Sequence, residues 1–291
     1  MSRLKEIKEE HKATLDIRDL VSTYQEIASI RMRSTRDFVL KNREYYDGVN
    51  KIFSLVLNSY RNQLDALSKK GKSLLTKKQA SSLFNRNGSK IYVLLSANTY
   101  LYGSIVADTF NRFYEDLKTD ASAHAAVVGK VGKRLLDDSD YTEKYTYFDL
   151  SDSLGDNSHL NDILKCILSY ETVVVYHGSF KTILSQLPEA SFLTGGSESV
   201  QKTNKNIQFN FEPDFNTVLA FFEDQIIASN FEQSVNESYL SKYASRMISL
   251  DHSLGEIDKH VKKLNLRKQK VKHYVTNKKQ QDTIAGLHLW N

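Results

Sequence analysis

The strongest pattern in the chain lies at residues 240–264, which read LSKYASRMISLDHSLGEIDKHVKKL. Large apolar residues recur there at alternating steps of three and four: Leu240, Tyr243, Met247, Leu250, Leu254, Ile257, Val261 and Leu264. A mean step of about 3.5 is typical of a coiled-coil seam rather than of one side of a compact helical bundle. The stretch therefore predicts a long helix that packs against another long helix.

This helix is predicted to extend well beyond the quoted stretch. The apolar stripe skips Lys268 and returns at Val271 and Val275. Residues 214–285 contain no proline and a single glycine, Gly255. A continuous helix over these residues would be on the order of 100 Å long, which is more than a globular domain needs.

A second helix with a narrow seam is expected at the beginning of the chain, where residues 1–47 lack glycine and proline. Its apolar residues form two runs with the same spacing: Ile17, Leu20, Tyr24 and Ile27, and then Phe38, Tyr45, Val49, Ile52 and Val56. A seam without a partner would be left in water. We therefore expect the two terminal helices to pair in antiparallel fashion through these residues, with the excess length of the C-terminal helix projecting beyond its partner.

The middle of the chain has a different pattern, in which short apolar runs alternate with helical segments. The expected strands are residues 91–95, 125–128, 172–176 and 207–211, the last at an edge of the sheet. The expected helices are residues 104–118, 160–168 and 180–187. Continuous apolar runs indicate strands that are covered on both faces, and their alternation with helices predicts a small layered domain with a parallel core.

These patterns divide the chain into four parts. They are an N-terminal coiled-coil helix at 1–68, a polar linker at 69–88, a central α/β domain at 89–211 and a C-terminal coiled-coil helix at 212–291. The predicted fold class is α/β plus long helices, namely an antiparallel coiled coil of the two terminal helices with a central Rossmann-like α/β domain.

Composition excludes several classes of protein. The chain has 291 residues and a mild net charge of +5, and its single cysteine, Cys166, rules out an internal disulfide framework. No stretch approaches the roughly 18 consecutive apolar residues of a membrane span. The first twelve residues mix lysines with glutamates, which is unlike a signal or transit peptide. We expect a soluble, intracellular protein that meets a membrane only through partners.

The usual motifs of nucleotide binding and catalysis are missing from the sequence. Residues 96–103, which follow the first expected strand, contain one glycine, whereas the dinucleotide-binding fingerprint needs three. The run Gly129-Lys-Val-Gly-Lys133 is too short for a P-loop and is followed by Arg134. Neither a zinc-ligand cluster nor a catalytic triad can be identified from spacing. We therefore expect the chain to bind no cofactor or metal and to have no active site of its own.

The sharpest charge feature is a block of nine basic residues between Lys259 and Lys279, here called the basic collar, with no acid between Asp258 and Asp282. It suits a solvated helix face, a nucleic-acid contact or an acidic protein socket. The collar has one aromatic residue, Tyr274, which weighs against nucleic acid. The apolar end at 284–290 indicates insertion into an apolar sleeve, or folding back onto the chain's own domain.

Several short motifs recur in an order that belongs to one known family. They are Leu4 to Lys8, the Ala-Ser-Ile-Arg-Met-Arg run at 28–33, Ser96 to Ser104, Gly129 to Gly132, Phe-Glu-Pro-Asp at 211–214 and Tyr-Ala-Ser-Arg-Met at 243–247. Over nearly its whole length the chain resembles the gamma subunit of F-type rotary ATP synthases. Asn98, Tyr100 and Tyr102 depart from the family's pattern in the third motif.

The resemblance implies a non-catalytic central-stalk rotor that couples rotation to ATP synthesis or hydrolysis and to a membrane ion-translocating ring. The implied partners are an alternating hexamer of catalytic and non-catalytic subunits, an epsilon-type subunit and the membrane rotor ring. ATP, ADP and magnesium would be bound by the partners, and no nucleic acid is expected. The implied location is the cytoplasmic side of the cell membrane, reached through the complex.

The resemblance also implies three groups of contact residues. The rotor–stator contact is assigned to Arg246, Lys272, His273, Asn277, Lys278 and Lys279, the bearing tip to Leu287, Leu289 and Trp290, and the foot contact to Phe211 and Glu212. In this chain a base, Lys279, stands where the family has the acid of its Thr-x-Glu motif. Two alternatives stay open, a gamma-like axle of a specialised ATPase that does not serve ion-coupled synthesis and a non-rotary basic coiled-coil scaffold.

Overall fold

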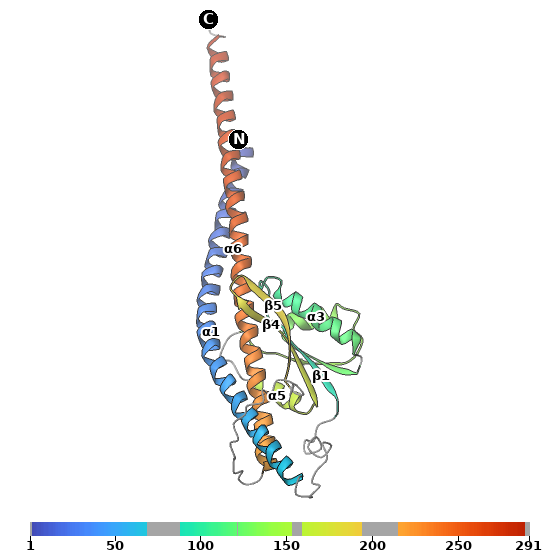
Figure 1. Ribbon diagram of the computed structural model, residues 1–291. Coiled ribbons are helices and arrows are strands. Elements are labelled where there is room, and N and C mark those ends of the chain that lie inside the picture. The colour runs from blue at the N-terminus through green and yellow to red at the C-terminus, as the bar shows by residue number, and fades with distance from the viewer. Residues whose placement is uncertain (1, 69–87, 121, 153–158, 194–214, 289–291) are drawn as a thin grey trace. The chain divides into compact units, whose positions relative to one another are not determined.

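The computed structural model describes residues 2–68, 88–120, 122–152, 159–193 and 215–288. Two long helices, α1 (Ser2–Ser68) and α6 (Phe215–His288), flank the other elements in the chain order (Figure 1). The chain separates into two compact units, residues 1–30 with 246–291 and residues 31–245. Both long helices contribute to both units.

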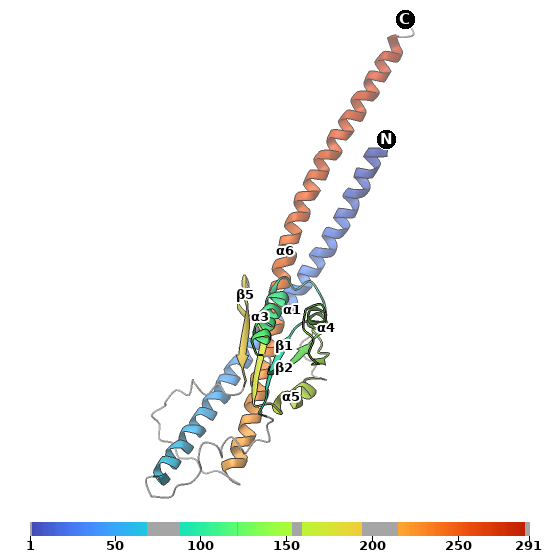
Figure 2. The ribbon, with the colours of Figure 1, turned by 90° about the vertical axis from the view of Figure 1, so that its right-hand side faces the viewer.

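The first unit is an antiparallel coiled coil, as the sequence predicts. Gln25 Nε2 donates to Asp251 Oδ1 at 2.9 Å, and Arg18 Nε donates to Asp258 Oδ1 at 2.6 Å. The residue numbers of the partners decrease along α1 as they increase along α6, so the two helices run antiparallel. In Figures 1 and 2 α6 continues past the N-terminal end of α1, and every side chain of residues 276–286 is exposed. The predicted overhang is confirmed.

The seam of α6 also follows the predicted stripe. Leu250 and Leu264 are buried, and Leu254, Ile257 and Val261 are half-buried. Lys268, which interrupts the apolar pattern, is half-buried at the next seam position. A lysine can occupy such a position because its aliphatic stem covers apolar surface while its ammonium reaches water. The burial pattern of the helix therefore continues through Lys268, although the stripe of apolar residues is interrupted there.

The predicted seam of α1 is wrong. Ile17, Leu20, Tyr24 and Ile27 are 53, 57, 47 and 43% exposed, and we call them the outer stripe. The residues turned towards α6 lie one position further along the helix: Arg18, Val21, Gln25 and Ala28. Ala28 is buried in this seam, and Arg18 and Gln25 bond to Asp258 and Asp251 of α6. Spacing alone cannot choose between two stripes one residue apart.

The second unit contains a five-stranded sheet in the order β3-β2-β1-β4-β5. Its strands are β1 (Lys90–Leu95), β2 (Ala123–Val128), β3 (Tyr145–Phe148), β4 (Thr172–Thr182) and β5 (Ser185–Phe192). The first four are parallel, and β5 pairs with β4 in antiparallel fashion. The order 3-2-1-4-5 is that of Rossmann-type folds, so the predicted fold class is confirmed.

Three shorter helices accompany the sheet: α3 (Ile105–Thr119), α4 (Lys130–Asp137) and α5 (Leu160–Leu168). Helices α3 and α5 match the sequence prediction, and α3 covers the sheet with Phe110, Phe113 and Leu117. The prediction of a helix at 180–187 is wrong, because these residues form the β4–β5 hairpin, in which Phe180 pairs with Gln186. Pairing with the long strand β4 outweighs the local helical tendency of this segment.

Two further elements, β3 and α4, were not foreseen. The glycine-rich run at 129–133 begins α4 instead of forming only a turn. Gly129 has a φ of +100°, and a Cβ there would lie 2.8 Å from Ala97 O, so only glycine fits. The expected strand at 207–211 lies outside the described residues.

Candidate functional site

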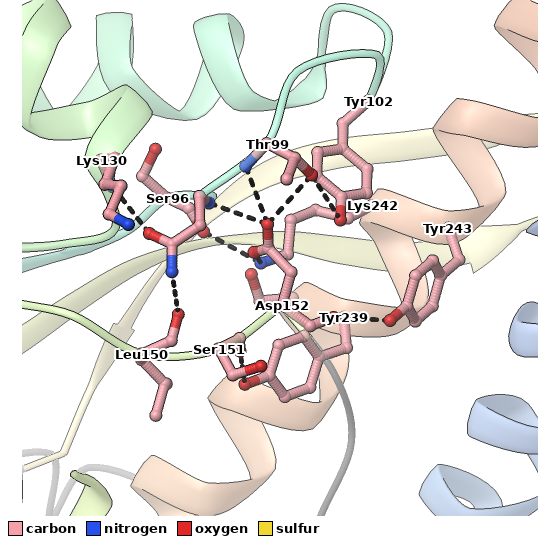
Figure 3. A network of polar contacts seen from close by, with 12 residues as sticks. Ser96, Thr99, Tyr102, Lys130, Leu150, Ser151, Asp152, Tyr239, Lys242 and Tyr243 are labelled. Atoms are coloured by element: carbon pink, nitrogen blue, oxygen red, sulfur yellow. Dashed lines mark hydrogen bonds and ion pairs between the residues drawn. The ribbon is translucent and has the colours of Figure 1, made fainter. Parts of the chain in front are cut away.

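In open α/β sheets, ligands usually bind in the crevice outside the carboxyl ends of the strands, at the point where the strand order reverses. Here that point lies between β1 and β4. Helix α6 fills it with Lys242, whose side chain is 7% exposed. The Lys242 ammonium donates to Ser96 O at 2.9 Å and to Asp152 Oδ1 at 3.2 Å (Figure 3). The cavity that remains there has a volume of about 10 Å³, which leaves no room for a nucleotide.

Asp152 is held in place from the opposite side by the loop that follows β1. Its Oδ2 accepts hydrogen bonds from the backbone N–H groups of Asn98 at 2.8 Å and Thr99 at 2.9 Å, and from Thr99 Oγ1 at 3.2 Å. The carboxylate side chain is 13% exposed. A buried ion pair is tolerated when further hydrogen bonds satisfy its remaining polar atoms, and Asp152 meets this condition.

Two tyrosines of α6 extend the same contact along the helix. Tyr239 donates its hydroxyl to Ser151 O at 2.7 Å, and Tyr243 donates to Asp152 O at 2.5 Å. The Lys242 ammonium also lies 4.8 Å from the centroid of the Tyr239 ring, within the range of a cation–π contact. We call Ser96, Asp152, Tyr239, Lys242 and Tyr243 the polar clamp. It fastens the ends of the parallel strands to α6.

Close backbone packing supports the clamp from β4. A Cβ at Gly178 would lie 2.3 Å from Ser241 Oγ of α6, so the strand can approach the helix only because residue 178 has no side chain. Asn98 stabilises the loop beside the clamp. Its Nδ2 donates to Leu150 O at 2.9 Å, and its Oδ1 accepts from the first N–H of α4, that of Lys130, at 2.9 Å. Asn98 was noted from the sequence only as a departure from the family pattern.

The polar clamp was missed from the sequence, although a signal exists. Lys242 and Ser241 lie beside Leu240 and Tyr243, all buried. A lysine amid buried neighbours requires an anionic partner, but the sequence does not reveal which of its many acids that is. The hydrogen bonds of the polar clamp join α6 to the loops at the strand ends.

Six of the contact residues inferred from the resemblance have side chains in the described part of the chain, all of them on α6. Arg246 is half-buried, whereas Lys272, His273, Asn277, Lys278 and Lys279 are exposed along the last part of α6. The Leu287 side chain and Leu289, Trp290, Phe211 and Glu212 lie outside the described part of the chain. Within that part, no helix is long and apolar enough to cross a membrane, and no three histidine, cysteine or acidic side chains converge as a metal site.

Comparisons with known proteins agree with one another. The profile of the ATP synthase family, ATP-synt, matches residues 3–277. The chain is 19% identical to the ATP synthase gamma chain of Clostridium perfringens, with 97% of this chain and 96% of the relative covered. This chain belongs to the ATP synthase gamma-chain family. A gamma chain of Buchnera aphidicola subsp. Schlechtendalia chinensis is 22% identical, with 98% of this chain and 94% of that one covered.

A solved structure supports the same fold for this gamma-family chain. The match is a chain of the central stalk and c-ring of the Tetrahymena thermophila mitochondrial ATP synthase. Its TM-score is 0.57 at 15% identity, and the match covers 80% of this chain and 99% of that one. The long helices and the sheet are therefore the shared architecture, and the low identity leaves the individual contact residues to be tested.

Proposed function

We propose that this gamma-family chain is the central-stalk rotor of an F-type rotary ATPase and that its coiled coil turns inside a ring of partner subunits. The observation that carries the proposal is the outer stripe. Four large apolar side chains of α1 are 43–57% exposed along one face of the coil. Such faces mark surfaces that another protein covers, and a ring around the coil would cover this one.

The family supplies the identity of the proposed partners. The ring would consist of alternating catalytic and non-catalytic subunits, and these subunits would bind ATP, ADP and magnesium in place of this chain. An epsilon-type subunit and the membrane rotor ring would meet the α/β domain, with Phe211 and Glu212 at that contact. The assembly would be attached peripherally to the cytoplasmic side of the membrane.

Coupling requires that the rotor contact the catalytic subunits differently at each angle, so that each angle favours one conformation at each site. The coil meets this need because its faces differ. One face carries the apolar outer stripe, and the overhang carries exposed cations, including Lys272, Lys278 and Lys279. These cations would attract acidic loops of the ring, with an attraction that salt weakens. Leu287, Leu289 and Trp290 would form the apolar end of the bearing.

The polar clamp gives the rotor a rigid joint within the second unit. Rotation that enters through the α/β domain has to reach α6 without slipping. Lys242, Tyr239 and Tyr243 are spaced over one turn of α6, and each bonds to a loop at the strand ends. Directional contacts of this kind resist sliding, unlike purely apolar packing.

The proposal is tested by purifying the assembly through a tag on this chain. We expect nucleotide-binding subunits to co-purify in threefold excess over it. Replacing Leu20 of the outer stripe with Asp should reduce their recovery, because a carboxylate would be buried against the ring. Replacing the neighbouring exposed Asp19 with Asn is the matched control and should leave recovery unchanged. Salt-sensitive retention of nucleic acid without ATP-binding partners would contradict the proposal.

A further inference from the structure

Helix α1 carries two stripes at coiled-coil spacing, one residue apart, and only one of them faces α6. Each residue of the outer stripe directly precedes a residue of the seam: Ile17 precedes Arg18, Leu20 precedes Val21, Tyr24 precedes Gln25, and Ile27 precedes Ala28. One residue corresponds to about 100° of rotation in an α-helix. A turn of α1 by that angle about its own axis would therefore exchange the two stripes.

Within the first unit, the stripe that faces α6 is the more polar one. Among the described residues of α1 in this unit, only Ile7 and Ala28 are buried, and Arg18 and Gln25 are half-buried. His11 Nε2 is buried without a hydrogen-bond partner among the described residues, which is unfavourable. The α6 side of the seam is apolar and consists of Leu250, Leu254, Ile257, Val261 and Leu264. The outer stripe would match that side better than the present seam does.

The second unit has the opposite preference. Its part of the α1 seam consists of Met32, Thr35, Val39 and Tyr46, which are at most 4% exposed. The stripe one residue earlier includes the polar residues Arg31, Ser34 and Lys41. Turning the helix here would bring charge against α6 and expose buried apolar surface. The preference changes at the boundary between Ile30 and Arg31, where the chain also divides into its two units.

For residues 2–30 each of the two packings has its own advantages. The observed packing buries Ile7 and Ala28 and forms two polar contacts with α6, which are largely exposed and so contribute little. The turned packing would cover the outer stripe, whose side chains are now 43–57% exposed. Glu6 and Glu10 would then flank the level of Lys268 on α6, which carries the opposite charge.

A shift of one residue can be absorbed inside a helix. A single π-type turn holds one extra residue, and such turns occur within α-helices. One such turn near Ile30 would advance residues 2–30 by one position and leave the rest of α1 unchanged. The two helices would separate slightly, because the distance between packed helices follows the size of the side chains at their contact.

We propose that residues 2–30 of α1 alternate between two packings on α6, the observed one with the outer stripe in solvent and a turned one with that stripe in the seam. A partner shifts such an equilibrium only by binding one state more tightly. The ring of partner subunits would contact the outer stripe and so hold the chain in the observed packing. This last step rests on the proposed function, whereas the exchange in the free chain does not.

Disulfide trapping in the full chain with Cys166→Ser separates the two packings. The contacts of Arg18 and Gln25 with α6 place residues 20 and 21 at the level of Leu254. In a Leu254→Cys background, Val21→Cys therefore traps the observed packing and Leu20→Cys traps the turned one. Asp19→Cys is the matched control, because residue 19 is 78% exposed and lies on the side of α1 away from α6 in both packings.

In the purified chain, we expect the Leu20 and Val21 pairs to form intramolecular disulfides at least about tenfold faster than the Asp19 pair. In the assembly, only the Val21 pair should remain fast. Gln25→Leu makes the observed seam more apolar, and it should slow the Leu20 pair in the purified chain without slowing the Val21 pair.

The exchange is overturned if either the Leu20 or the Val21 pair closes no faster than the Asp19 pair in the purified chain. An undiminished rate of the Leu20 pair within the assembly would overturn the claim that partners hold the observed packing. The comparison in the purified chain involves no partner. A failure of the proposed function, which is read from co-purification, is therefore distinguishable from a failure of this inference.

Discussion

Replacing Lys242 with Met tests the polar clamp most directly. Methionine keeps the length and most of the apolar stem but removes the ammonium that binds Ser96 O and Asp152 Oδ1. Asp152 is left as a carboxylate that is 13% exposed and has no cation. Removing one member of a buried ion pair typically costs about 3–5 kcal/mol.

The lower end of this range applies here, because Asp152 Oδ2 keeps its three donors from Asn98 and Thr99. We expect the clamp to weaken by about 3 kcal/mol, and 1.4 kcal/mol corresponds to a factor of ten. The amide protons of Asn98 and Thr99 report on it directly, since both donate to Asp152. Their hydrogen exchange should become on the order of 100-fold faster if local opening governs exchange.

Lys259→Met is the control, since Lys259 lies on the same helix, is 69% exposed and forms an exposed ion pair with Glu256. Exposed pairs contribute at most about 1 kcal/mol, so exchange at Asn98 and Thr99 should not change. The double variant with Asp152→Asn should recover part of the loss, because the unpaired charge is gone. Unchanged exchange in Lys242→Met would refute the claim that the ion pair holds the joint.

Three further predictions concern other parts of the chain. Gly178→Ala should lower the free energy of unfolding by about 1–3 kcal/mol in urea titrations, because its Cβ would meet Ser241 Oγ at 2.3 Å. The control is Gly255→Ala, which should raise the free energy of unfolding by about 0.5–1 kcal/mol, because nothing lies within 4 Å of its Cβ. Equal effects of the two substitutions would contradict the packing argument. Replacing Lys272, Lys278 and Lys279 together with Glu should slow ATP turnover of the assembly at low salt and less so at high salt, and unchanged turnover and rotation would exclude a role for their charge. Burial lowers the pKa of His177 below its usual 6.5, despite the opposing pull of Glu189 and Glu237, so below about pH 6.5 the unfolded chain binds the extra proton and stability falls with falling pH. His177→Gln should flatten that part of the profile of urea midpoints against pH, whereas an unchanged slope would place the titration elsewhere.

The parts of the fold that local periodicity determines could be predicted from the sequence. The heptad stripe of α6 predicted both the helix and its seam, because each step depends only on residues three or four positions away. The apolar runs of β1, β2 and β4 predicted buried parallel strands for a similar reason. The hairpin at 180–187 was mistaken for a helix, because its conformation depends on pairing between Phe180 and Gln186 across the turn.

The contacts that join distant segments could not be predicted in this way. Lys242 and Asp152 are 90 positions apart in the chain, and the sequence around either residue does not indicate that the other is its partner. The prediction of the α1 seam was wrong for a different reason. The apolar spacing favoured the outer stripe, but in the structure Gln25 and Arg18 face Asp251 and Asp258 of α6. The pattern on one helix does not reveal which of two stripes one residue apart faces the partner helix.

The outer stripe has a consequence for how the chain must be made. Helix α1 turns a seam containing Arg18 and Gln25 inward and Ile17, Leu20, Tyr24 and Ile27 outward, so a stripe of large apolar side chains is on the outside of the coil. A newly synthesised copy exposes this stripe to every other copy until the proposed partners enclose it. Supply of the chain in excess of those partners should therefore produce aggregates.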